Sequence, residues 1–349
     1  MNINFIESII KLMKNKIKKK LIIGFSIGDY NGIGPEVLIK SFSNKKLFKR
    51  CIPVIFCDPK IIKFYKNKLK IQIDIFICSN ISSIKENVLN IYSIINNDIS
   101  IEPGTVNSIV GEYALKSLEE LFISINNNKI NGIVTLPFSK ISIQSKKFNF
   151  PGHTEYLLEK TNQKENIMIM VSNKIKIGFI SGHLSLKLMI NSINKEKFYN
   201  KILIFINSLK YDFNIEKPKI AILGINPHAG EFGLLGKEEI ELINPIINKL
   251  NKKENKIEGP FSADSFFGMK NYLKYDGVIS CYHDQGLIGF KSLFFDEGVN
   301  YTGGLPIVRT SPDHGTAHDI AGKGKASELS LTNAIKLNIK ILNNRNFNS

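Results

Sequence analysis

The chain has 349 residues, 43% of them hydrophobic, and a formal net charge of +16. This length predicts two domains or one large α/β unit with a substantial core. The charge does not indicate nucleic acid as a partner, because the excess is mostly lysine scattered among isoleucine and asparagine rather than clustered with arginine and aromatic residues. No apolar run approaches the ~18 residues of a membrane span. We therefore expect neither nucleic acid nor a membrane as the main partner.

The N-terminal residues 1–20 form a separate extension. Its apolar block precedes its lysines, which is the reverse of a secretory signal. Its apolar residues could stripe one face of a basic helix at a membrane surface, although a loosely docked extension is the simpler interpretation. The four cysteines form no CxxC pair, and we interpret them as buried, reduced thiols of a cytoplasmic protein.

From residue 21 onward, short apolar runs alternate with helix-like segments. Strands are predicted over 21–28, 52–57, 72–78, 132–138, 175–182, 219–226 and 275–281, and helices after the Gly-Pro pair at 34–35, over 111–125 and over 328–342. This alternation predicts an α/β fold with largely parallel sheets. We expect a first domain of 21–145 plus 296–349, a second domain of 146–295, and a ligand cleft between them.

Four histidines follow strand-like runs or stand in glycine-flanked turns: His153, His183, His228 and His283. A lone histidine usually lies in the core or in solvent, but the carboxyl ends of parallel strands are where ligands gather. Three histidines can bind a divalent metal through neutral imidazoles and leave coordination sites for substrate oxygens. The long spacing between these histidines provides no local motif, so the alternatives stay open at this point.

Two cations follow further along the chain. Lys291 and Arg309 could be ordinary surface charges. Arg309, however, is one of only three arginines and follows an apolar run, which favours a phosphate-binding role.

Neither of two glycine-rich segments identifies a binding function by itself. The turn GDYNGIGPE (28–36) follows the first strand, but Val37 stands where a GxGxxG pattern needs its third glycine, and the Lys-Ser/Thr of a P-loop is missing. It could be no more than a tight turn with free amides. The loop TSPDHGTAHDIAGKGKAS (310–327) could be purely structural.

Taken together, ordered blocks in the chain resemble the 4-hydroxythreonine-4-phosphate dehydrogenase family of pyridoxal phosphate biosynthesis. They are GDYNGIGPE, VTLPFSK, FPGHTEYL, SGHLSL, INPHAGEFG, GPFSADSFF, YHDQGLIGFK and GLPIVRTSPDHGTAHDIAGKGKA, and they span about residue 21 to the C-terminus. The resemblance implies two α/β/α domains around a cleft, as in isocitrate and isopropylmalate dehydrogenases. It also implies NAD or NADP, one divalent cation (zinc, magnesium or cobalt), and a homodimer with an active site shared between subunits.

The resemblance also implies roles for particular residues. Metal binding falls on His183, His228 and His283, with the last contributed by the partner subunit. Substrate binding falls on His153, Thr154, Lys291, Asn300 and Arg309, and cofactor binding on His314, Gly315, Thr316 and Asp319 of the 310–327 loop. Asp264 and Asp284 are candidates for the general base, or for groups that orient a histidine or lysine. The chain departs from the family pattern at Tyr30-Asn31, where Pro-Ala is usual, and at His318, where an apolar residue is usual.

The implied reaction is NAD(P)-dependent oxidation of 4-phosphohydroxy-L-threonine to 2-amino-3-oxo-4-(phosphonooxy)butanoate, which decarboxylates to 3-amino-2-oxopropyl phosphate. The nearest alternative is a paralogous dehydrogenase that acts on 4-phospho-threonate or 4-phospho-erythronate. An alternative of another class is a phosphate acyltransferase-like transferase, since phosphate acetyltransferases have a related two-domain architecture.

Overall fold

The computed structural model describes residues 20–95, 99–144, 148, 150, 152–253 and 255–347, so nearly all of the predicted N-terminal extension lies outside the described residues. Its strands form a 12-stranded sheet in the order β3-β4-β2-β1-β5-β12-β11-β6-β7-β10-β8-β9. The strands are β1 (Leu21–Ser26), β2 (Cys51–Cys57), β3 (Ile75–Cys78), β4 (Leu89–Ser93), β5 (Gly132–Thr135), β6 (Ile167–Val171), β7 (Lys176–Phe179), β8 (Lys219–Leu223), β9 (Lys256–Phe261), β10 (Gly277–Ser280), β11 (Val299–Gly303) and β12 (Arg309–Pro312).

Most neighbouring strands in this sheet are parallel, which confirms the predicted α/β class. The antiparallel pairs are β12–β11, β11–β6 and β6–β7, at the middle of the sheet. There the strands of the two predicted domains meet, because β11 belongs to 296–349 and β6 to 146–295. The two sets of strands thus occupy opposite halves of one continuous sheet, and the domain division itself stays a prediction.

All seven predicted strands are present, but β4, β6, β9, β11 and β12 were not predicted. The segment IMIMV of β6 is a short apolar run without alternation, which periodicity cannot distinguish from other buried segments. Strands β11 and β12 carry Asn300, Thr302 and Arg309, whose polar side chains obscure the strand pattern. These polar positions lie at the candidate site described below.

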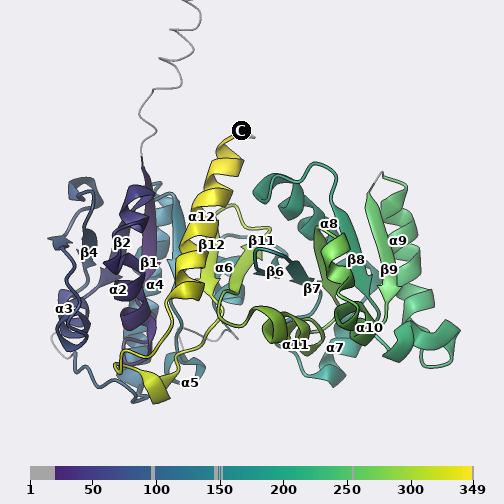
Figure 1. Cartoon of the computed structure of the whole chain (residues 1–349), viewed down its shortest axis with the longest axis horizontal. Coiled ribbons are helices and arrows are strands. Elements are labelled where there is room, and N and C mark those ends of the chain that lie inside the picture. Colours follow the sequence, from purple (N-terminus) through teal and green to yellow (C-terminus); the bar gives the residue numbers. More distant parts are fainter. Residues whose placement is uncertain are drawn as a thin grey trace, which may run out of the picture.

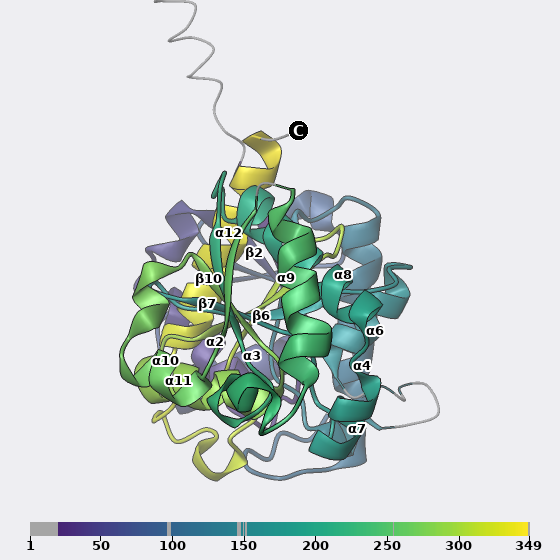
Figure 2. The same cartoon turned by 90° about the vertical axis from the view of Figure 1, so that its right-hand side faces the viewer.

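Helices cover both faces of the sheet (Figures 1 and 2), with α4, α6, α8 and α9 on one face and α2, α10, α11 and α12 on the other. The helices are α2 (Gly34–Ser43), α3 (Pro59–Lys68), α4 (Ser108–Asn126), α5 (Lys140–Ile143), α6 (His153–Lys160), α7 (Leu186–Ser192), α8 (Lys195–Asn207), α9 (Asn244–Asn251), α10 (Ala263–Gly268), α11 (His283–Phe294) and α12 (Leu329–Phe347). Three of them confirm the predicted helices: α2 after Gly34, α4 over 111–125 and α12 over 328–342. Among the described residues, none of the helices combines the length and apolarity needed to cross a bilayer.

Two glycines allow helices to pack closely on opposite faces of the sheet. A Cβ on Gly24 of β1 would lie 2.5 Å from the side chain of Leu121 in α4. A Cβ on Gly132 of β5 would lie 2.2 Å from the side chain of Asn338 in α12. Such distances are far inside van der Waals contact, so a larger residue at either position would force the facing helix side chain to shift.

The carboxyl ends of the parallel strands meet along one edge of the sheet, the lower edge in Figure 1, where α5, α7 and α11 lie. Helix α11 begins at His283, shortly after β10 ends at Ser280. Helix α6 begins at His153, with Gly152 at its N-cap. Helix starts therefore place two of the predicted site residues at this edge, as the βα connections of an α/β fold require.

Candidate active site

A cavity of about 300 Å³ lies at this edge and is lined by residues from both halves of the sheet. It brings together His153, Thr154, His183, His283, Lys291, Asn300, Arg309, His314 and Gly315, all predicted from the sequence. They come from β11, β12, α6, α11 and the loops after β7 and β12. The cavity is therefore the candidate active site.

Arg309 is the buried cation of this cavity, with only 3% of its surface exposed. Its Nε and Nη2 donate to Thr135 Oγ1 at 3.0 and 2.7 Å, and its Nη1 donates to Thr302 Oγ1 at 3.1 Å. Burial lowers the pKa of Arg309 to about 10, against a smaller opposing effect of Glu155. Within the described part of the chain its hydrogen bonds go to hydroxyl groups, so the guanidinium is oriented but its charge is not matched by a hydrogen-bonded carboxylate. Such a cation suits a phosphate or carboxylate ligand.

Unlike Arg309, several polar atoms of the cavity lack hydrogen-bond partners within the described residues. Glu155 Oε2, Asn300 Oδ1 and His314 Nε2 are buried, and none has a hydrogen-bond partner among the described residues. Buried polar atoms in native proteins are normally paired, so three unpaired ones around a single cavity are consistent with a bound ligand or water. Lys291 Nζ lies 3.4 Å from Asp313 Oδ2 and is partly exposed towards the cavity.

His153 is held in its neutral form. Its ring packs on Phe138 with centroids 3.9 Å apart. Burial, and then the charge of Arg309, lower the pKa of His153 well below its usual range. A neutral imidazole can both donate and accept a hydrogen bond, and it places no second cation beside Arg309. The first turn of α6, which starts at His153, adds free backbone amides that favour an anion.

His183 and His283 lie side by side, with ring centroids 5.1 Å apart. His283 Nδ1 is 2.6 Å from Asp284 Oδ1, so this carboxylate orients the ring and leaves Nε2 for another partner. Burial, and then the charges of Lys140 and His283, lower the pKa of His183, which favours the neutral form that binds metals. We expected His283 to come from a partner subunit, yet a single chain brings it beside His183.

His228 lies elsewhere, in a second cavity formed with Glu231, Phe232 and Ile240. Its backbone is left-handed, as are those of Ala229, Glu231 and Phe232, with φ between 41° and 55°. Consecutive non-glycine residues in this region are strained, and such strain is concentrated at functional sites. Within the described part of one chain, no group of three or more His, Cys, Asp or Glu side chains could hold a metal.

Neither candidate base lines the cavity of Arg309. Asp284 is 75% exposed and bound to His283, which fits an orienting role. Asp264 is exposed, and its pKa is lowered by hydrogen bonds from Ser262 and Ser265 and by the nearby charge of His228. Thr316 and Asp319 also lie outside the cavity lining, further along the 310–327 loop.

The lining residues that were not predicted from the sequence include Thr135, Lys140, Glu155 and Asp313. Glu155 directly follows the predicted pair His153-Thr154, and Thr135 ends β5, so proximity to a motif and a strand end were available signals. No local sequence feature pointed to Asp313, because it pairs with Lys291 only when α11 packs against the loop after β12.

A parallel-sheet α/β fold with a buried arginine and neutral histidines at its strand ends defines an enzyme that binds a small anionic ligand. The sequence profile of the family described as "Pyridoxal phosphate biosynthetic protein PdxA" matches residues 49–338. The chain belongs to this family, and it is therefore an oxidoreductase rather than a transferase.

The relatives and solved structures agree with this assignment. A 4-hydroxythreonine-4-phosphate dehydrogenase of Bacteroides thetaiotaomicron is 41% identical over 94% of this chain and 90% of its own length. A protein of Clostridium botulinum, provisionally named D-threonate 4-phosphate dehydrogenase, is 34% identical over 93% of this chain and 98% of its own length. The crystal structure of 4-hydroxythreonine-4-phosphate dehydrogenase from Klebsiella pneumoniae superposes with a TM-score of 0.80 and 31% identity, covering 93% of this chain and 100% of that one.

Proposed function

We propose that the protein is a 4-hydroxythreonine-4-phosphate dehydrogenase. It oxidises the C3 hydroxyl of 4-phosphohydroxy-L-threonine with NAD or NADP, and the product, 2-amino-3-oxo-4-(phosphonooxy)butanoate, decarboxylates to 3-amino-2-oxopropyl phosphate. The observation that carries this proposal is that Arg309 is a buried cation without a hydrogen-bonded carboxylate. The chain around it is 41% identical to a 4-hydroxythreonine-4-phosphate dehydrogenase.

The cavity residues divide the binding of this substrate among them. Arg309 and Lys291 hold its phosphate and carboxylate, because both are cations at the cavity and Arg309 is fixed by two threonines. Asn300 and His153, with Thr154 beside it, supply neutral hydrogen bonds that orient the carbon chain. Fixing the reacting hydroxyl in one geometry is itself a large part of catalysis.

The histidines fit one divalent cation, zinc, magnesium or cobalt, only when a second copy of the chain takes part. His183 and His283 provide two imidazole rings side by side, and His228 of a second copy would provide the third. When bound, the cation would lower the pKa of the substrate hydroxyl. Because Asp264 lies near His228, the same copy would bring it to the cavity, which keeps it a candidate for the group that takes the hydroxyl proton.

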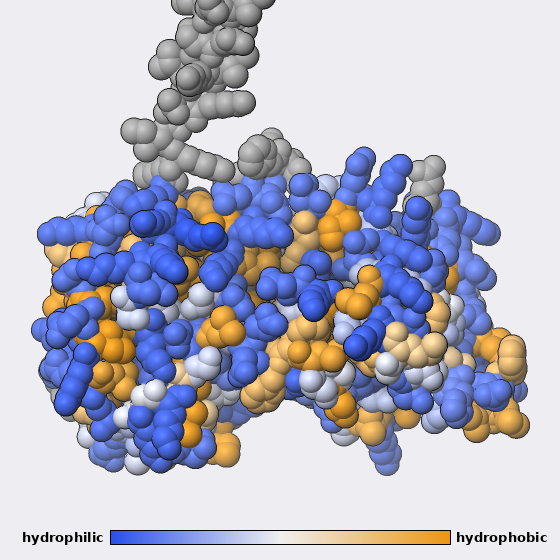
Figure 3. Space-filling model, viewed as in Figure 1, coloured by the Kyte–Doolittle hydropathy of each residue, from blue (hydrophilic) through white to orange (hydrophobic). Residues whose placement is uncertain are grey.

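Exposed apolar side chains support a homodimer that shares its sites in this way. In the loop of His228, Phe232 is 98% exposed and Leu234 81% exposed. Hydrophobic surface is visible there at the lower right end of the molecule (Figure 3). Further exposed apolar residues lie around the Arg309 cavity on α7 and α11: Leu186, Leu188, Ile190, Ile288 and Leu293. Apolar exposure on this scale marks an interface, and pairing these surfaces would carry the His228 loop to the other subunit.

The 310–327 loop supplies the cofactor contacts in this proposal. His314 and Gly315 reach the cavity, while Thr316 and Asp319 lie further out, where the adenosine end would extend. All four cysteines are buried and unpaired, as expected in a reducing compartment, so we place the enzyme in the cytoplasm.

The second candidate is a dehydrogenase for 4-phospho-D-threonate, which the 34% identical relatives favour. NAD(P) reduction by the purified enzyme with 4-phosphohydroxy-L-threonine and with 4-phospho-D-threonate separates the two. We expect kcat/KM to be higher for the amino substrate, with loss of turnover on chelation and recovery on adding a divalent cation. Preference for the threonate would assign the second function, and turnover that survives verified metal removal would contradict the metal site.

A further inference from the structure

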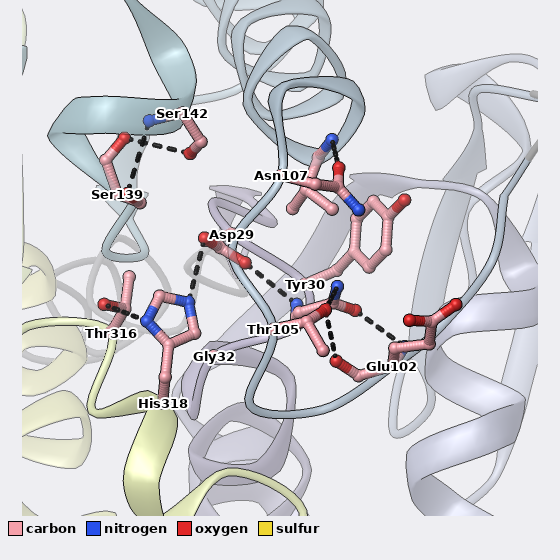
Figure 4. A network of polar contacts seen from close by, with 12 residues as sticks. Asp29, Tyr30, Gly32, Glu102, Thr105, Asn107, Ser139, Ser142, Thr316 and His318 are labelled. Atoms are coloured by element: carbon pink, nitrogen blue, oxygen red, sulfur yellow. Dashed lines mark hydrogen bonds and ion pairs between the residues drawn. The ribbon is translucent and has the colours of Figure 1, made fainter.

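Three segments meet near the carboxyl end of β1, around the imidazole of His318 (Figure 4). His318 Nε2 lies 3.1 Å from Asp29 Oδ2, and its Nδ1 lies 3.2 Å from Thr316 Oγ1. The Asp29 side chain is fully buried, and its other oxygen accepts a hydrogen bond from the Asn31 amide at 3.0 Å. His318 therefore bridges the glycine turn 28–33 and the 310–327 loop.

The backbones of these segments are also in direct contact. The Ile33 amide donates to Thr316 O at 2.9 Å, and a Cβ on Gly32 would lie 2.8 Å from that same oxygen. A Cβ on Gly104 would lie 3.1 Å from His318 O, so the 102–105 segment approaches from the other side. The glycines permit this approach, and the side chain of His318 fixes its position.

The far end of the loop is held by the helix that follows the same turn. The buried carboxylate of Glu36 accepts hydrogen bonds from the amides of Gly324 and Ala326 at 3.3 and 3.0 Å. Lys40 Nζ donates to Gly324 O at 3.2 Å. Residues 29–40 thus fasten the loop at two places, one at 316–318 and one at 324–326. His314 and Gly315, which reach the cavity, immediately precede the first place.

We propose that the His318–Asp29 pair is a positioning element for the nicotinamide cofactor: it holds residues 314–319 in the conformation that binds the cofactor. The proposal rests on the function proposed above. Its physical basis is that Asp29 Oδ2 has His318 as its hydrogen-bond partner within the described residues. Without that imidazole, a buried carboxylate oxygen is left unpaired, which is costly. The loop relieves this cost when it moves away and admits water, and this movement displaces His314 and Gly315.

The test compares His318→Leu, which removes the donor, with His318→Gln, whose amide nitrogen can take the place of Nε2. Kd for NAD is measured by calorimetry, KM for NAD and for 4-phosphohydroxy-L-threonine by kinetics, and loop opening by hydrogen exchange over 314–321. We expect His318→Leu to raise Kd and KM for NAD about tenfold, the loss typical of one hydrogen bond to a buried charge, and to speed exchange in the loop. KM for the phosphorylated substrate should change less than about twofold, since Arg309 and Lys291 are untouched. His318→Gln should recover most of the affinity.

An exposed lysine replaced in the same way, Lys49→Leu, is the control for the loss of a polar side chain. The proposal is overturned by an unchanged Kd for NAD in folded His318→Leu, by equal losses in the Leu and Gln variants, or by equal losses of NAD and substrate binding. Adding Asp29→Asn to His318→Leu removes the unpaired charge, so the double variant should lose less affinity than the two single variants together. If the wild-type enzyme reduces NAD normally and these variants do too, only this inference fails. If the wild-type enzyme neither binds nor reduces NAD, the proposed function fails with it.

Discussion

The imidazole rings of His183 and His283 lie with their centroids 5.1 Å apart within one chain, while His228 lines a different cavity. This pairing decides which subunits can complement one another. If a second copy supplies His228, a site needs His183 and His283 from one subunit and His228 from the other.

We predict that mixing His228→Ala subunits with His283→Ala subunits restores activity. Each heterodimer then has one intact site and one site that lacks two ligands. Random exchange makes half of the dimers heterodimers, so the mixture should reach about a quarter of wild-type activity, whereas each variant alone should be inactive. Steady-state rates before and after subunit exchange, with heterodimers verified by mass, measure the effect.

The matched control is a mixture of His183→Ala with His283→Ala, which should remain inactive because every site then lacks one ligand. Recovery in both mixtures would place His283, rather than His228, on the partner subunit.

Replacing Arg309 should weaken substrate binding and leave cofactor binding intact. Arg309→Met keeps most of the side-chain volume but removes the charge, so we expect a loss of about 100-fold in kcat/KM for the phosphorylated substrate, or ~3 kcal/mol, as for other buried charge contacts. Kd for NAD from calorimetry should be unchanged. Arg50→Met removes an exposed arginine and is the control. An unchanged KM for the substrate in folded Arg309→Met would remove this residue from the anion site.

His153 should make the protein less stable in mild acid. Burial lowers the folded-state pKa of His153 well below its unfolded value near 6.5, so the folded form binds no proton there as pH falls while the unfolded form does. The stabilisation from neutral His153 is therefore complete above pH 6.5 and is lost as the pH falls below 6.5. We predict that His153→Gln reduces the fall in unfolding free energy between pH 7.5 and 5.5 by at most ~1.4 kcal/mol. Urea denaturation at both pH values measures it, and an identical fall in wild type and variant would show that His153 titrates normally.

Asp212 should support stability without affecting catalysis. Its carboxylate accepts hydrogen bonds from Arg345 Nε at 2.7 Å and Tyr301 Oη at 2.5 Å, which ties α12 to β11. Asp212→Ala leaves a largely buried arginine and tyrosine without this partner, so we expect the unfolding free energy to fall by ~3 kcal/mol. Thermal denaturation measures the loss, while kcat/KM below the transition should match wild type, because Asp212 lies outside the Arg309 cavity. An unfolding free energy unchanged within error would show that the contacts of Asp212 with Arg345 and Tyr301 contribute nothing to stability.

The sequence alone determined the α/β class, seven of the strands and nine of the residues that line the cavity. These depend on neighbours along the chain: apolar runs of strand length, glycine and proline at turns, and polar residues where a strand ends. The ordered motif blocks added the family, because His153, Lys291 and Arg309 keep their place within recognisable segments.

The tertiary structure decided what depends on the order of strands in space. Local periodicity carries no information about which strand ends become neighbours, so it could not show that His183 and His283 belong together while His228 lies apart. It could not place Thr135 and Thr302 around the guanidinium of Arg309, or join Asp29 to His318, since those contacts form only when distant strands and loops pack together. The antiparallel pairing of β11 with β6 makes one sheet of the two halves, and it could not be predicted for the same reason.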